Sequence, residues 1–377
     1  MIKRVNLGLS VLVVVALLFP MGLSVATAAP PAQEETYTVK LGDNLWTLAE
    51  KYLGNGAAYW AIVGATNKKA GEDATFAHIA NPSLIHPGWK LLIPGPEGAE
   101  AVLGLGTEAN PIIWSFVPSG EMERVAAGAE SVADLIYEET GLVIETNVAT
   151  EYAGVIEAMC ADPPKAHMAS LATFAYVLAA GKGCAEAELV SVRYGLPTYN
   201  GQFIVRADSG IESVADLAGK TFCRPDPLST SGWIIPMLTM RAAGIDTDTD
   251  LAEVVDAGSH DAVAAAVYNG DCDAGATYVD ARTRIEADYP DVMEKVVVIE
   301  FTEDIPNDGV QYETGFPRAL RDRINAALLK IAETEEGQEA LGTAYQWSAL
   351  LEVDDTFYDP FRQVLSASGL NIEDLME

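Results

Sequence analysis

Residues 221–232 read Thr-Phe-Cys-Arg-Pro-Asp-Pro-Leu-Ser-Thr-Ser-Gly, and they contain the pattern that decides the fold of this chain. The first four residues are typical of a short strand, and the apolar spacing of residues 233–243 predicts a helix. Ser229, Thr230 and Ser231 stand where that helix begins, beside its free backbone N–H groups and the positive end of its dipole. A single serine would suffice as an N-cap. The run therefore favours an anion-binding cradle over an ordinary N-cap with two incidental neighbours.

A second strand-to-helix junction carries the sequence Gly258-Ser259-His260-Asp261. It precedes a helix expected over residues 262–268, which Asn269-Gly270 would end. His260 can donate a hydrogen bond to an oxyanion as a neutral imidazole or as an imidazolium. Most lone histidines are structural, but a place at a second helix N-terminus favours ligand contact.

Two tyrosines, Tyr152 and Tyr176, stand where helices are expected to begin after strand-like segments. A phenol combines an apolar wall with one hydrogen-bond donor. The pattern alone leaves open whether either ring faces a ligand or the core.

From residue 110 onward, predicted strands alternate with predicted helices. Such alternation indicates an α/β fold in which parallel sheets are covered by helices on both faces and ligands bind beyond the carboxyl ends of the strands. Pro236 predicts a distorted start for the helix over 233–243. The predicted strands are 111–117, 142–148, 189–194, 202–206, 221–224, 252–257, 274–279 and 295–301, and the longest predicted helices are 122–140, 317–334 and 336–346.

Seven stretches carry a resemblance to a known family: Glu151–Ala153, Ala175–Ala179, Val214–Phe222, Asp226–Gly232, Gly258–Ala262, Asp273–Ala276 and Ile305–Asp308. Through them residues 110–377 resemble the phosphate/phosphite/phosphonate substrate-binding family of ABC transporters, which has the type II periplasmic binding-protein fold. The resemblance implies one lobe from residues 110–198 and 302–377, and a second from residues 206–296. Strands 202–206 and 296–301 would cross between them, and the lobes would close on a buried anion.

The same resemblance implies roles for individual residues. Ser229, Thr230, Ser231 and His260 would hold the oxyanion, Tyr152 and Tyr176 would close over it, and Asp280 would contact a substituent if the ligand has one. An aspartate beside a dianion is unfavourable unless it accepts a proton from the ligand or faces an amino group.

Neutral donors are expected to bind the anion, because the few arginines, Arg193, Arg206 and Arg224, include none clearly placed as a bidentate clamp. Phosphate, phosphite, a phosphonate or another tetrahedral oxyanion all remain open as the ligand. We expect no cofactor.

Residues 36–94 have the pattern of a separate βααβ unit. Tyr37 to Trp46 reads Tyr-Thr-Val-Lys-Leu-Gly-Asp-Asn-Leu-Trp, and Ile85 to Pro94 reads Ile-His-Pro-Gly-Trp-Lys-Leu-Leu-Ile-Pro. Both stretches resemble the LysM domain, which implies peptidoglycan binding in a shallow groove. Trp46 is expected in the core, residues 68–76 as an inserted loop, and residues 95–109 as a Gly-rich linker. By motif position the groove would be lined by Gly42, Asp43, Asn44, Leu45, Ile85 and Pro87.

The N-terminus reads as a signal peptide over residues 1–28, with Lys3-Arg4, an apolar run and the small residues Ala26-Thr-Ala28. An uncleaved membrane anchor is the competing interpretation. Export would place the protein in the periplasm or at the cell wall. Because no cysteine precedes Cys160, a lipid tether has no acceptor, and the LysM-like unit would supply retention instead.

The formal net charge of −32 argues against nucleic acid or an anionic membrane as a partner. The four cysteines, an even number, indicate two disulfides in an oxidising compartment. Of the three possible connectivities we favour Cys160–Cys184 and Cys223–Cys272, because each pair falls within one lobe. No Cys-x-x-Cys occurs and the histidines are scattered, so we expect no metal site.

The sequence thus predicts a monomeric solute receptor that is not an enzyme and that serves an ABC permease. A wall hydrolase is the main rival, because LysM units accompany such enzymes. No nucleophile with a base, and no metal with its ligands, emerges from the pattern. Two further functions stay open: a sensor subunit that presents the anion to a membrane kinase, and a structural wall protein.

Overall fold

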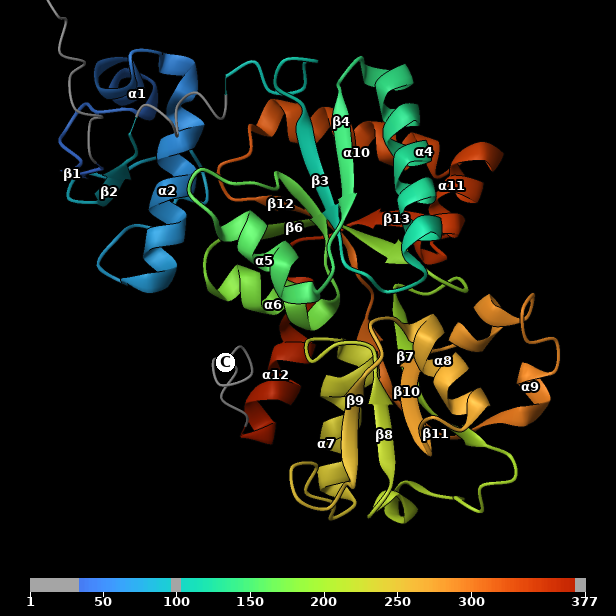
Figure 1. Cartoon of the computed structure of the whole chain (residues 1–377). Helices are drawn as coiled ribbons and strands as arrows, with labels where there is room; N and C mark the ends of the chain where they lie inside the picture. The colour runs from blue at the N-terminus through green and yellow to red at the C-terminus, as the bar shows by residue number, and fades with distance from the viewer. Residues whose placement is uncertain (1–33, 96–102, 370–377) are drawn as a thin grey trace, which may run out of the picture. The chain divides into compact units, whose positions relative to one another are not determined.

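The computed structural model describes residues 34–95 and 103–369 (Figure 1). The predicted signal peptide lies outside the described residues, and so do residues 96–102 of the predicted linker. Within the described ranges, no helix is both long and apolar enough to cross a membrane.

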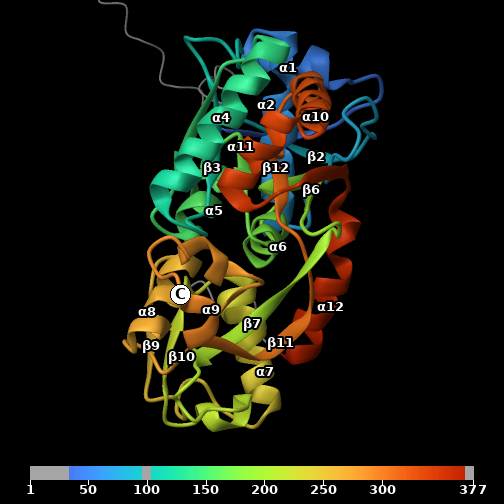
Figure 2. The ribbon, with the colours of Figure 1, turned by 90° about the vertical axis from the view of Figure 1, so that its right-hand side faces the viewer.

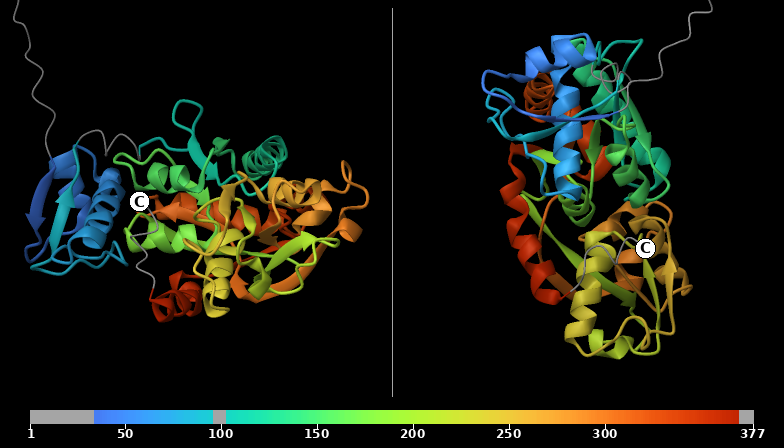
Figure 3. Two further views of the ribbon diagram at one scale, coloured as in Figure 1. Left: turned by 60° about the horizontal axis from the view of Figure 1, so that its bottom comes forward. Right: turned by 90° about the vertical axis from the view of Figure 1, so that its left-hand side faces the viewer.

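The N-terminal unit is a two-stranded antiparallel sheet packed on two helices (blue in Figure 3). Its first helix begins where the Asn44 side chain accepts a hydrogen bond from the Thr47 N–H at 2.9 Å, as an N-cap does. The second helix continues to Glu72, through part of the segment predicted as an inserted loop. The elements are β1 (Glu35–Thr38), α1 (Leu45–Leu53), α2 (Tyr59–Glu72) and β2 (Lys90–Ile93), in the predicted βααβ order.

The first lobe contains a six-stranded sheet with the strand order β13-β6-β12-β5-β3-β4. Strand β3 runs parallel to β4 and β5, whereas β12 and β13 are antiparallel to their neighbours. Its strands are β3 (Ile112–Phe116), β4 (Ile144–Val148), β5 (Met168–Ser170), β6 (Ala185–Val192), β12 (Gly309–Glu313) and β13 (Ala349–Glu352); the helices of these segments are α4 (Met122–Thr140), α5 (Tyr152–Cys160), α6 (Thr173–Gly181), α10 (Arg318–Ile331), α11 (Glu335–Tyr345) and α12 (Asp359–Ser368).

The second lobe contains a five-stranded sheet with the order β11-β7-β10-β8-β9. Strand β8 is parallel to β9 and β10, and β7 is antiparallel to β10 and β11. Its strands are β7 (Thr198–Arg206), β8 (Thr221–Arg224), β9 (Glu253–Asp256), β10 (Ala274–Tyr278) and β11 (Val296–Pro306), and its helices are α7 (Ile235–Ala242), α8 (His260–Asn269) and α9 (Val292–Lys295).

Two long strands connect the lobes. Strands β7 and β11 pair antiparallel from Val296 opposite Arg206 to Pro306 opposite Thr198 (Figure 2). Strand β7 follows β6 of the first sheet, and β11 leads back into β12 of that sheet. The predicted fold, an α/β protein of two lobes with two crossing strands, is therefore present.

The expectation of parallel sheets was correct only for three adjacent strands at one side of each sheet, β5, β3 and β4 in the first and β10, β8 and β9 in the second. Strands that enter or leave a lobe through the crossings run against their neighbours, because the chain returns from the opposite end of the sheet. The sequence pattern also missed three short strands, β5, β12 and β13.

The disulfides join Cys160 to Cys184 and Cys223 to Cys272, the two pairs favoured from the sequence. The first ties the end of α5 to the start of β6, and the second ties β8 to the turn before β10. Each disulfide therefore lies within a single lobe, the first in the first lobe and the second in the second lobe.

Candidate functional site

A small cavity lies at the junction of the two lobes, and we call it the interlobe cavity. It leaves about 20 Å³ for the centre of a water-sized sphere, which is room for one small ion rather than for a large organic ligand. Its lining is Val117, Ser119, Gly120, Arg124, Tyr152, Ala172, Arg193, Tyr199, Ser229, Thr230, Ser231, His260, Tyr278, Asp308, Ala344 and Tyr345.

The three hydroxyl residues reach the interlobe cavity because the helix after β8 begins with a π-helical turn, Thr230–Ile234. The Ser229 Oγ accepts the Gly232 N–H at 3.2 Å, and the Thr230 Oγ1 accepts the Phe174 N–H of the other lobe at 2.9 Å. A hydroxyl that accepts one bond still has its own proton to donate. All three residues are buried, so they present donors to the cavity in a region that excludes water.

His260 lies at the start of α8 and is 3% exposed. Burial, helped by the charge of Arg193, lowers the pKa of its imidazole to about 3, so the ring is neutral. Its Nδ1 accepts the backbone N–H of Tyr278 at 3.3 Å. The ring proton is therefore on Nε2, which lies 3.3 Å from the Ser229 Oγ. The imidazole is a donor toward the cavity.

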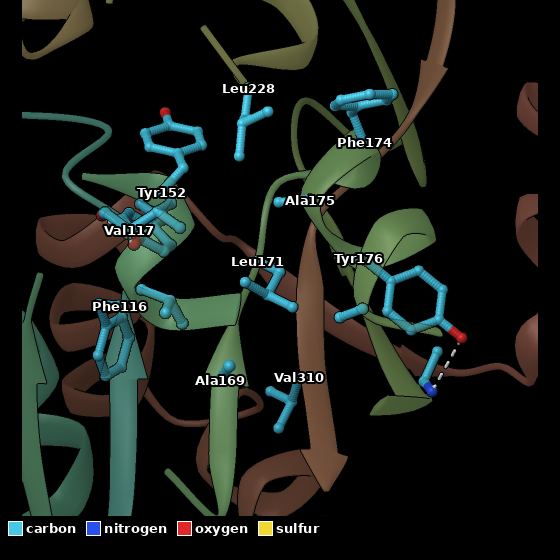
Figure 4. Packing of buried hydrophobic residues seen from close by; sticks show 14 of the residues in the cluster. Phe116, Val117, Tyr152, Ala169, Leu171, Phe174, Ala175, Tyr176, Leu228 and Val310 are labelled. Carbon is cyan, nitrogen blue, oxygen red and sulfur yellow. Dashed lines mark hydrogen bonds between the residues drawn. The ribbon is translucent and has the colours of Figure 1, made fainter. Parts of the chain in front are cut away.

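The two tyrosines predicted to close over the ligand lie in different places. Tyr152 begins α5 and lines the cavity; burial holds the pKa of its phenol well above the usual value, so it stays a neutral donor. The Tyr176 hydroxyl instead donates to the Asp355 carboxylate at 2.6 Å and accepts the Ala187 N–H at 3.2 Å. Figure 4 shows the ring of Tyr176 directed away from Tyr152. Tyr176 does not line the cavity.

Asp280, the predicted contact for a substituent, is also absent from the lining. Both of its carboxylate oxygens accept hydrogen bonds from Arg282 at 2.9 Å, and Gln202 donates to one of them at 3.1 Å. Burial opposes ionisation of this carboxyl, but these donors lower its pKa overall. The structure therefore gives Asp280 a local ion pair and no place at the cavity.

Sequence reasoning missed an ion pair in the cavity wall. Arg193 is 7% exposed, and its Nη2 donates to the Asp308 Oδ2 at 2.8 Å. The guanidinium lies 5.4 Å from the ring centre of Tyr199 and 5.7 Å from that of Tyr278. Asp308 stands in the Ile305-Pro-Asn-Asp308 stretch that carried the resemblance. That motif was the only signal available for it.

Hydrogen bonds hold the two lobes together around the cavity. Arg124 of α4 donates to the Asp261 Oδ2 of α8 at 2.7 Å, and the Glu121 N–H donates to the same oxygen at 3.0 Å. The His260 N–H donates to the Ser119 carbonyl at 3.2 Å. The lobes are thus in a closed arrangement.

The N-terminal unit has a groove of its own, with about 290 Å³ for the centre of a water-sized sphere. Four of the six predicted residues line it, whereas Gly42 and Pro87 do not. Trp46 was expected in the core, and this expectation was wrong: the side chain is 54% exposed and lines the groove, because its ring packs outside Gly56. The lining is Asp43, Asn44, Leu45, Trp46, Tyr59, Pro82, Ser83 and Ile85.

No group of three or more His, Cys, Asp or Glu side chains suited to a metal ion occurs in the part of the chain that the structure describes. The interlobe cavity has one carboxylate in its described lining, that of Asp308.

Comparison with known proteins gives relatives for both units. A LysM domain matches residues 37–68. Among curated relatives, a phosphate-import protein of Mycolicibacterium smegmatis is 33% identical over 197 residues, which cover 49% of this chain and 61% of the relative. A phosphonates-binding periplasmic protein of Escherichia coli is 26% identical over 249 residues, or 62% of this chain and 72% of the relative. The chain thus spans about three fifths of the first relative's length.

Solved structures show the same fold. The binding-protein component of a phosphonate ABC transporter from Pseudomonas aeruginosa aligns with a TM-score of 0.63 at 23% identity, covering 69% of this chain and 87% of that one. A Prochlorococcus marinus protein in complex with methylphosphonate aligns with a TM-score of 0.60 at 14% identity, covering 68% and 97%. The family model described as "ABC transporter, phosphonate, periplasmic substrate-binding protein" matches residues 114–358. The chain therefore belongs to this substrate-binding family and carries an N-terminal LysM domain.

Proposed function

We propose that this protein captures a small tetrahedral oxyanion outside the cytoplasm and delivers it to an ABC permease. The observation that carries the proposal is the interlobe cavity, where the three hydroxyls of residues 229–231 and the Nε2–H of His260 meet the phenol of Tyr152 from the other lobe. Preorganised donors in a closed, water-excluding site suit an anion. Phosphate and phosphite are the favoured ligands.

The strongly acidic surface does not oppose this role. At ordinary salt, charges are screened over roughly 8–10 Å, so the net charge of −32 acts weakly on an ion that is already inside the cavity. Short-range donors provide the binding instead. Burial raises the pKa of Tyr199 and Tyr278 to about 12, so both phenols keep their protons beside an anion.

The size of the cavity supports a bare ion over a phosphonate with a long substituent. Room of about 20 Å³ for the centre of a water-sized sphere fits a tetrahedral ion and little more. An amino group on a substituent would find no partner in Asp280, which is engaged with Arg282 away from the cavity. A phosphonate ligand would therefore have to be small, such as methylphosphonate.

The tautomer of His260 argues against catalysis by the Ser229–His260 pair, because the ring nitrogen that faces Ser229 carries a proton. The pattern suggested no base near the serines, yet the fold brings His260 Nε2 to 3.3 Å from the Ser229 Oγ. A general base needs an unprotonated nitrogen toward the hydroxyl. Because Nδ1 already accepts the Tyr278 N–H, the nitrogen that faces Ser229 carries the proton. The pair is built to donate, so we place the protein among binding proteins.

Retention at the cell wall is assigned to the LysM unit. We take residues 36–94 as this domain, residues 95–109 as a linker and residues 110–377 as the monomeric solute-binding part, exported by residues 1–28. The groove beside Trp46 supports peptidoglycan as its partner, because a half-exposed aromatic ring gives a sugar an apolar face to stack on.

Calorimetric titration tests the proposed function. The purified chain from residue 33 onward is titrated with phosphate, phosphite, methylphosphonate and 2-aminoethylphosphonate. We expect one site per chain, with phosphate or phosphite tightest. Replacing Ser229, Thr230 and Ser231 together by alanine should weaken binding at least about 100-fold, since each hydrogen bond to a charged group is worth about 1.5–3 kcal/mol.

A matched control is Thr334→Ala. The Thr334 Oγ1 accepts the Gly337 N–H at 3.0 Å as the N-cap of α11, and this residue does not line the cavity. Its loss should leave the affinity unchanged. Absence of heat with all four ligands, or full affinity in the triple alanine variant, would contradict the proposed function.

A further inference from the structure

The interlobe cavity offers donors on most sides and a carboxylate on one side. Its donors include hydroxyls, an imidazole N–H and phenols, whereas Asp308 is the only carboxylate in the described lining. An anion that only accepts hydrogen bonds cannot bond to a carboxylate, whereas an anion that carries a hydroxyl can donate a hydrogen bond to it. We propose that the Arg193–Asp308 pair selects oxyanions that retain a proton, so that the site accepts phosphate and rejects sulfate. This inference rests on the proposed function and specifies its ligand.

Arg193 has a donor to spare. Its Nη2 is engaged by Asp308 at 2.8 Å, but its Nε has no hydrogen-bond partner among the described residues, although it is buried. A buried donor without a partner costs about 1–3 kcal/mol. The rings of Tyr199 and Tyr278 flank the guanidinium and hold it in place. An oxygen of the ligand would satisfy the Nε–H of Arg193.

Asp308 has an acceptor site to spare. Its Oδ1 accepts from the Ser191 hydroxyl at 3.1 Å and from the Trp347 Nε1–H at 3.3 Å, and its Oδ2 accepts from Arg193. An ionised carboxylate has about four acceptor sites and no donor. Three bonds therefore leave one acceptor site on a carboxylate that lines the cavity. Only a ligand atom that carries a proton can fill it favourably.

The difference between phosphate and sulfate in protonation then decides which ion binds. Phosphate at neutral pH carries at least one P–OH group, which can donate to Asp308 in a short, charge-assisted bond. Sulfate carries no proton, so one of its oxygens would face the carboxylate with no hydrogen between them. Arg193 is already neutralised by Asp308 and offers no surplus charge in compensation. Sites that hydrogen-bond a ligand hydroxyl reject analogues without it by large factors.

The test compares phosphate, sulfate and monofluorophosphate in calorimetric titrations of the wild-type chain at neutral pH. Monofluorophosphate matches hydrogen phosphate in shape and charge but has fluorine in place of the hydroxyl. We expect phosphate to bind at least about 100-fold more tightly than either analogue. Monofluorophosphate or sulfate binding within about threefold of phosphate would overturn the inference and leave the proposed function standing. No binding by any of the three ions would also overturn the inference, and the titrations with phosphite and the two phosphonates would then decide whether the proposed function stands.

Two variants place the effect on the carboxylate. Asp308→Asn keeps the shape but gives up the charge, and it should reduce the ratio of phosphate to sulfate affinity to below about 10. Ser191→Ala removes one hydrogen bond from the same carboxylate and keeps the charge, so its ratio should remain near that of the wild type. An unchanged ratio in a folded Asp308→Asn protein would overturn the inference. The monofluorophosphate comparison needs no variant and decides the matter if Asp308→Asn fails to fold.

Discussion

Replacing the cavity imidazole should change how stability depends on pH. His260 is buried, and its imidazole has a pKa of about 3 in place of the ordinary value of 6.5. The His260→Gln variant has a side chain of similar size that does not titrate. The variant also loses the acceptor for the Tyr278 N–H, which lowers stability by about the same amount at every pH. The pH-dependent part of the difference therefore reports the buried imidazole.

The magnitude follows from the difference between the two states. As pH falls below 6.5 the unfolded imidazole takes up a proton, whereas the folded one stays neutral until about pH 3. The unfolded state then binds more protons, so stability is present above the unfolded value and is lost on acidification. A pH of about 5 is roughly 1.5 units below the pKa of the imidazole in the unfolded chain. At about 1.36 kcal/mol per unit, wild type loses about 2 kcal/mol that His260→Gln keeps.

Urea unfolding at several pH values between about 7 and 5 measures this difference. The gap between wild type and His260→Gln should narrow by about 2 kcal/mol over that range. His86→Gln, which removes an exposed imidazole, serves as the control and should follow the wild type. Parallel stability curves for wild type and His260→Gln would refute the argument, because the ring could then take up its proton in the folded state.

Three further predictions concern closure, covalent stability and wall binding. Asp261→Asn weakens the bond from Arg124 between the lobes and should lower oxyanion affinity about 3- to 30-fold, chiefly through faster release in stopped-flow measurements; an unchanged release rate would exclude this contact as part of closure. Replacing Cys223 and Cys272 by serine opens a link across 49 positions and should lower the free energy of unfolding by about 2–5 kcal/mol, and an unchanged urea midpoint would contradict a structural role. Trp46→Ala should reduce cosedimentation with purified peptidoglycan with little change in melting temperature, and undiminished cosedimentation would remove Trp46 from the sugar groove.

Local sequence patterns predicted the parts of the site that lie within one junction. Ser229 to Ser231 and His260 each follow a strand and begin a helix, so the chain direction alone places them at the carboxyl edge of the second sheet. The same reasoning could not separate Tyr152 from Tyr176. Both were expected to begin helices, but Tyr152 begins α5 whereas Tyr176 is the fourth residue of α6. The Tyr176 hydroxyl donates to Asp355, away from the cavity.

The Arg193–Asp308 pair lay beyond the reach of sequence patterns. The two residues are 115 positions apart, and they meet because β6 and β12 are antiparallel neighbours in the first sheet. The sequence pattern missed β12 altogether, so it offered no reason to bring them together. Trp46 was misplaced for a different reason. Its position in an apolar helical pattern predicts a core residue, but its ring lies against Gly56 and is half-exposed.

A crystal structure grown with arsenate, a phosphate analogue whose arsenic atom scatters anomalously, tests the central claim most directly. The account predicts a single strong arsenic peak inside the interlobe cavity, with arsenate oxygens at hydrogen-bonding distance from Ser229, Thr230, His260 and Arg193. An arsenic peak elsewhere, or a cavity that stays empty at an arsenate concentration well above that needed for phosphate binding, would contradict it.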